Sequence, residues 1–202
     1  MIDFSAAAMS AAPMPSPSDA SHRPRASSSA GGAPATCVRS LAGRAFAAEP
    51  HQPGNFVAVT ERIHTAGQPT ATQLGALKDR GYGLVINLAP PASSRYIADE
   101  GMLVARAGIS YLNIPVDFRN PRYEDFEIFS AMLKASASLR VLVHCQVNKR
   151  ASAFTFLYRV VHEGVVPNRA WESVSAVWVP DERWAEFIRS VLKRHQIDYD
   201  PF

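Results

Sequence analysis

The stretch that decides the fold spans residues 141–152 and reads VLVHCQVNKRAS. It opens with three consecutive apolar residues, the pattern of a short strand that is buried on both faces. Cys145 follows almost directly, and Arg150 comes five residues later, where we expect a helix to begin. Ligands of open α/β sheets bind at the carboxyl ends of the strands. The sequence therefore predicts that this cysteine lies at a ligand site.

Strand-like and helix-like segments alternate along the rest of the chain. Residues 84–88 form a second apolar run, and Asn87 within it needs a hydrogen-bond partner, so we interpret it as structural. Thr70 and Gln73 have the spacing of a capping box, which opens a helix that we expect to stop at Gly81. Further strands are expected near 56–60, 62–66 and 111–114, and helices over about 97–107 and around 126–133, 154–161, 171–178 and 184–192. This order predicts a single three-layer α/β domain, a central and mostly parallel sheet flanked by helices.

The first 50 residues differ from the rest in composition. Ala, Ser, Pro and Gly occupy 32 of these 50 positions, which leaves too little apolar surface to offset the entropy of ordering the backbone. We therefore expect residues 1–50 to form a disordered leader and residues 51–202 to form the domain. The leader lacks the basic start and apolar stretch of a signal peptide. An export-related role and a misplaced translation start remain alternatives at this stage.

Composition excludes several classes of protein. With 47% hydrophobic and 19% charged residues, most of the chain is typical of a globular protein. No apolar run approaches the ~20 residues that span a bilayer, so no membrane span is expected. The net charge of +3 comes without a run of Lys or Arg, so nucleic acid is not an expected partner. Two cysteines make no disulfide framework, and the six histidines lack metal-ligand spacing, so we expect no metal and no other cofactor.

The loop after the 141–143 strand has the features of an anion site. Its successive backbone N–H groups can converge on one point beside the positive end of the following helix. Such a field favours the thiolate form of Cys145 and creates a pocket for an oxyanion above the sulfur. The loop has no glycine, but Asn148 is a residue that could adopt a left-handed conformation in its place. The residues expected to bind the anion are Gln146, Val147, Asn148, Lys149 and Arg150.

The pattern His-Cys-x4-Arg, with a strand before it and a helix after it, resembles the cysteine-dependent protein tyrosine phosphatase superfamily. Four further segments are similar to a bacterial branch of dual-specificity-like phosphatases: TAGQPT at 65–70, VINL at 85–88, IPVDF at 114–118 and VWVPDERW at 177–184. The similarity covers about residues 53–192. It implies a protein tyrosine phosphatase-like fold.

The resemblance also implies roles for individual residues. Cys145 would be the nucleophile, Arg150 the phosphate-binding arginine and Asp117 the general acid that protonates the leaving oxygen. His144 would hold the cysteine loop by hydrogen bonds. The position after the arginine, where the family often has a hydroxyl that helps the thiolate leave, is an alanine, and Ser152 comes one residue later. Breakdown of a phosphoenzyme is therefore expected to be slow.

The resulting expectation is a phosphatase that hydrolyses phosphate monoesters, on phosphotyrosine or with dual specificity, through a phosphocysteine intermediate. Its partner would be a phosphorylated protein or a small phosphomonoester. A reactive thiol favours a reducing compartment and hence the cytoplasm. Two alternatives stay open: a rhodanese-like sulfurtransferase that carries a persulfide on Cys145 and needs no general acid, and a phosphate-binding pseudophosphatase with weak turnover.

Overall fold

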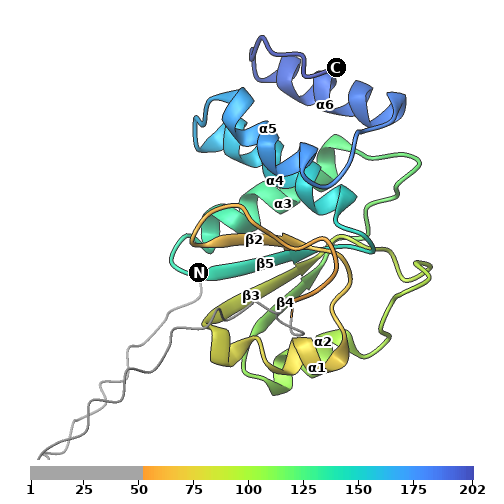
Figure 1. Cartoon of the computed structure of the whole chain (residues 1–202), viewed down its shortest axis with the longest axis vertical. Coiled ribbons are helices and arrows are strands. Elements are labelled where there is room, and N and C mark those ends of the chain that lie inside the picture. The colour runs from red at the N-terminus through yellow and green to blue at the C-terminus, as the bar shows by residue number, and fades with distance from the viewer. Residues whose placement is uncertain (1–51) are drawn as a thin grey trace, which may run out of the picture. The chain divides into compact units, whose positions relative to one another are not determined.

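A five-stranded sheet forms the middle layer of the domain (Figure 1). The computed structural model describes residues 52–202, so the expected leader and Cys37 lie outside the described residues. The strands lie in the order β1-β2-β5-β3-β4, with β1 antiparallel to β2 and all other neighbours parallel. Their bounds are β1 Val57–Ala58, β2 Ile63–Ala66, β3 Tyr82–Asn87, β4 Ser110–Asn113 and β5 Arg140–His144. The predicted mostly parallel sheet is confirmed.

Helices cover both faces of this sheet, which gives the predicted three layers (Figure 1). One face carries α1 and α2, and the other carries α3 to α6. The helices are α1 Ala71–Gly75, α2 Glu100–Arg106, α3 Tyr123–Ala135, α4 Lys149–His162, α5 Pro167–Ser175 and α6 Glu182–Arg194, and a short 3-10 helix spans Lys78–Arg80. No helix in residues 52–202 is long and apolar enough to cross a membrane.

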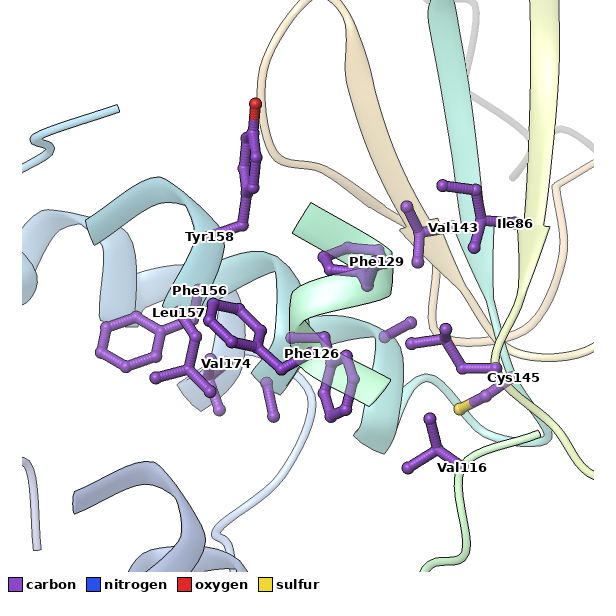
Figure 2. Close-up of a cluster of buried hydrophobic side chains, with 14 of the residues drawn as sticks. Ile86, Val116, Phe126, Phe129, Val143, Cys145, Phe156, Leu157, Tyr158 and Val174 are labelled. Carbon is purple, nitrogen blue, oxygen red and sulfur yellow. The ribbon is translucent and has the colours of Figure 1, made fainter. Parts of the chain in front are cut away.

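The alternation of side chains along the central strands supplies both cores. In β5, Val143 packs among the residues under α3 to α6, whereas Leu142 packs on the α1 and α2 side. In β3, Ile86 and Val85 divide in the same way. Successive side chains of a strand point to opposite faces, so an apolar run is the sequence of a strand covered on both. Figure 2 shows the core beneath α3 and α4, with Cys145 among its members.

Two helices have boundaries that differ from the predicted ones. The capping box of Thr70 and Gln73 is confirmed, because each side chain bonds to the backbone of the other residue. The helix that it opens ends at Gly75, and the 3-10 turn carries the chain on to Gly81, which adopts the left-handed conformation. The helix expected from about residue 97 begins only at Glu100, since the preceding segment closes separate turns instead.

Candidate active site

The cysteine loop lies where three neighbouring strands end. His144 is the last residue of β5, and it is paired with Ala66 at the end of β2 and with Asn87 at the end of β3. The Cys145 N–H donates to the Ala66 carbonyl at 3.2 Å, and the Leu88 N–H donates to the His144 carbonyl at 2.8 Å. The predicted position of Cys145 at the carboxyl edge of the sheet is therefore confirmed.

Asn148 closes the loop at the start of α4. Its backbone is left-handed, with φ of 70°, as its residue type allows. The side-chain amide donates to the Asn55 carbonyl at 2.6 Å and to the Thr65 hydroxyl at 3.1 Å. Asn55 in turn donates to the Val147 carbonyl at 3.0 Å. These bonds fix the turn that takes the chain from the strand into the helix.

Gly67 lets a second segment approach the loop closely. It forms an isolated bridge with Val147, and a Cβ atom at Gly67 would lie 2.9 Å from the Gly54 carbonyl oxygen and 3.2 Å from the Gln146 carbonyl oxygen. Any larger residue would push these segments apart. Sequence analysis missed this supporting role and that of Asn55, because nothing in their local pattern shows which distant segment they meet.

Arg150 is buried, and backbone carbonyls bind one nitrogen of its guanidinium. It is 5% exposed, and Nη1 donates to the carbonyls of Leu88 and Val116, each at 3.1 Å. Burial lowers the pKa of Arg150, while the negative charges of Cys145 and Asp117 and a hydrogen bond to Cys145 oppose that shift. Nε is buried and has no hydrogen-bond partner among residues 52–202. The guanidinium thus lies beside the sulfur with donor capacity left over.

Asp117 lies on the open side of the site. It is exposed, and its Oδ1 accepts from the Arg119 N–H at 2.9 Å. The next residue, Phe118, packs against the rings of Trp178 and Trp184, and its carbonyl accepts from Trp184 Nε1 at 3.0 Å. Asp117 therefore stands on a loop that is anchored to the helical layer, and its charge acts on the same arginine that neighbours Cys145.

The remaining residues of the loop are held at its rim. Gln146 donates to Ser94 at 2.7 Å, and Lys149 lies 4.9 Å above the centre of the Trp178 ring. The Ser152 hydroxyl donates to the Lys149 carbonyl at 3.0 Å and accepts from Trp178 Nε1 at 3.3 Å. Both hydrogen-bonding roles of Ser152 are thus used within the helical layer. Trp178 and Trp184 belong to the buried core of this layer.

His144 is wholly buried, and the partner of its ring was not foreseen. Its Nε2 lies 2.6 Å from Oε1 of Glu100, which is 1% exposed. Nothing in the sequence around Glu100 marks it as buried, because an acidic residue in the first turn of a helix is usually solvated. No group of three or more His, Cys, Asp or Glu side chains with the arrangement of a metal site occurs within residues 52–202.

Solved structures with similar folds identify the family. A protein of Shewanella putrefaciens CN-32, named a "putative phosphatase (DUF442)", is 35% identical, with a TM-score of 0.66, 71% of this chain covered and 94% of that chain covered. The phosphatase PTPMT1, solved with PI(5)P, shares the fold at 14% identity and a TM-score of 0.60, with 70% of this chain and 96% of that chain covered. The catalytic core of the PP-IP phosphatase SIW14 from S. cerevisiae also shares the fold, at 15% identity and a TM-score of 0.57. The match covers 71% of this chain and 94% of that chain. No family model and no curated protein matches the sequence. The chain belongs to the family of the Shewanella DUF442 protein, and its fold is protein tyrosine phosphatase-like.

Proposed function

We propose that this protein hydrolyses phosphate monoesters through a phosphocysteine intermediate. The observation that carries the proposal is the pairing of Cys145 with Arg150 at the carboxyl edge of the sheet. A buried guanidinium that is fixed by two carbonyls and retains an unpartnered Nε fits an oxyanion bound above the sulfur. The similarity to phosphatase structures supports the same chemistry.

The first step transfers the phosphoryl group to sulfur. The Cys145 thiolate attacks phosphorus, the S–P bond forms, and the ester P–O bond breaks with its electron pair on the leaving oxygen. Asp117, as a carboxylic acid, donates the proton that this oxygen needs. The exposure of Asp117 supports this role, because the acid must meet a substrate that arrives from solvent. Arg150 and the loop N–H groups from Gln146 to Lys149 stabilise the charge on the phosphoryl oxygens.

The second step hydrolyses the phosphocysteine and regenerates the free enzyme. Water attacks phosphorus, the S–P bond breaks, and Asp117 accepts the proton of the water. No hydroxyl follows Arg150 directly, and that of Ser152 is engaged by Lys149 and Trp178. We expect breakdown to be slower than formation. The same observation favours a second candidate function, a phosphate-binding protein with weak turnover.

The proposed substrate is a phosphotyrosine protein or a dual-specificity substrate, and the proposed compartment is the cytoplasm, where a thiolate stays reduced. Lys149 at the rim offers a positive charge to an incoming phosphate. A sulfurtransferase would have no use for Asp117, so the place of this residue directly after Val116, whose carbonyl Arg150 binds, favours the phosphatase.

The test follows phosphate release from para-nitrophenyl phosphate by the full chain, with a chelator present, across about pH 5–8. Cys145→Ser should abolish release, while the matched variant Cys37→Ser should retain it. Release that survives Cys145→Ser would contradict the proposal. No release by the wild-type protein, together with tight binding of tungstate, would favour the phosphate-binding protein. Sulfur transfer from thiosulfate to cyanide would favour the sulfurtransferase.

A further inference from the structure

A buried carboxylate joins the three strand ends that carry the cysteine loop. Glu100 is the first residue of α2, and its Oε1 lies 2.6 Å from His144 Nε2. Its Oε2 accepts from Gln68 Nε2 at 2.7 Å and from Asn87 Nδ2 at 3.4 Å. Gln68 follows β2, Asn87 ends β3 and His144 ends β5. One side chain therefore contacts all three segments.

Each partner of Glu100 also touches the proposed catalytic loop. His144 is bonded to Cys145 in the chain, and the Gln68 N–H donates to the Gln146 carbonyl at 3.2 Å. Asn87 Oδ1 accepts from the Ala89 N–H at 2.7 Å, which fixes the turn that presents the Leu88 carbonyl to Arg150. A displacement of the Glu100 side chain would therefore also displace Cys145, the loop and the carbonyl that binds Arg150.

The chemistry of the cluster requires an acceptor at this position. The Glu100 carboxyl lies within ion-pair distance of the His144 ring, with Oε1 2.6 Å from Nε2. Gln68 and Asn87 present N–H groups. The charged or titratable groups around the cluster are His144 from β5, Arg150 beside Cys145, and Tyr111 from β4, which accepts from Asn87. Burial and the negative charge of Glu100 raise the pKa of Tyr111 to about 12.

We propose that Glu100 is a positioning residue for Cys145: it holds the His144 ring in place and keeps the loop in its anion-binding shape. It meets neither substrate nor sulfur and acts through His144, Gln68 and Asn87. The catalytic consequence rests on the proposed phosphatase function, but the effect on the thiol itself does not.

The decisive variant is Glu100→Gln, which keeps the size of the side chain and replaces one acceptor by a donor. The NH2 group of the new amide must then face either the His144 ring or an N–H group of Gln68 or Asn87, so one contact of the cluster is lost. In a Cys37→Ser background, we expect half-maximal alkylation of Cys145 by iodoacetamide to move up by about one pH unit. Tungstate should bind about tenfold more weakly, and kcat should fall while KM changes little.

Two further variants separate this role from general loss of stability. Glu124→Gln changes an exposed carboxylate in the first turn of α3 and should leave the alkylation profile unchanged. Gln68→Met removes a single donor to Glu100 and should shift the alkylation profile of Cys145 in the same direction, but by less than Glu100→Gln does. If Glu100→Gln does not fold, the result for Gln68→Met decides whether Glu100 is a positioning residue. Wild-type alkylation and tungstate affinity in folded Glu100→Gln and Gln68→Met would overturn the proposal, as would an equal shift in Glu124→Gln. A wild-type chain without phosphatase activity whose alkylation still shifts in Glu100→Gln would overturn the proposed function alone.

Discussion

The two sides of the cysteine loop are built in opposite ways. On one side, Glu100 is buried and contacts the side chains of three strand ends. On the other side, Asp117 is exposed and accepts from the backbone N–H of Arg119. A buried carboxylate in contact with three neighbouring side chains holds one geometry, whereas an exposed carboxylate can meet a molecule that arrives from solvent. The difference separates a group that shapes the site from a group that is available for chemistry.

Arg150 joins these two sides, so its replacement should have the largest effect. Its guanidinium bonds to the Leu88 carbonyl after β3 and to the Val116 carbonyl just before Asp117. Arg150→Lys keeps the charge but loses the planar fork that grips two oxygens. We expect kcat/KM with para-nitrophenyl phosphate to fall about 10³-fold, with weaker tungstate binding. The exposed Arg169→Lys is the matched control, and a similar loss there, or a mild effect at Arg150, would contradict the account.

Asp117→Asn tests the open side alone. The amide keeps the shape of the turn but has no proton of suitable acidity, so we expect kcat to fall about 10²-fold and the alkaline limb of its pH profile to disappear. Alkylation of Cys145 should change little, in contrast to Glu100→Gln. The measurement is steady-state hydrolysis against pH, with the exposed Asp198→Asn as the control. An unchanged alkaline limb would remove Asp117 from the role of acid.

Substitutions of Asn148 test how much its left-handed backbone conformation contributes to the stability of the loop. Both Asn148→Gly and Asn148→Ala lose the bonds to Asn55 and Thr65, but only alanine is strained by the left-handed φ. We expect the alanine variant to be less stable than the glycine variant by about 1 kcal/mol in urea unfolding. Equal stabilities would mean that the amide bonds alone fix the turn.

His64 tests a region away from the loop and should give the smallest effect. Burial and the charge of Arg140 lower the pKa of His64 below its usual 6.5. Below that pH the unfolded chain binds more protons, so the free energy of unfolding should decrease as pH falls through the folded pKa. Urea midpoints at about pH 7.5 and about pH 5.5 should therefore differ less in His64→Gln than in the wild type. An equal difference in both proteins would rule out this contribution.

The sequence is sufficient for the fold and for the centre of the site, but not for its surroundings. Continuous apolar runs predict β3 and β5, and the polar loop between β5 and α4 places Cys145 and Arg150. The Glu100–His144 contact joins segments that are distant in the chain, and no local pattern encodes it. Ser152 is the opposite case. Its place one residue beyond the expected hydroxyl position already predicts slow breakdown of a phosphoenzyme, and the fold in addition brings Trp178 to its hydroxyl.

The central claim is that phosphate passes through Cys145, and trapping the intermediate tests it most directly. The full chain is mixed with para-nitrophenyl phosphate, quenched in acid within the first turnover and digested for mass spectrometry. The account predicts one phosphoryl group on Cys145, which accumulates because the Ser152 hydroxyl is already bonded to the Lys149 carbonyl and to Trp178. Steady release of phosphate without phosphorylated Cys145 at any quench time, or a phosphoryl group on another residue, would contradict it.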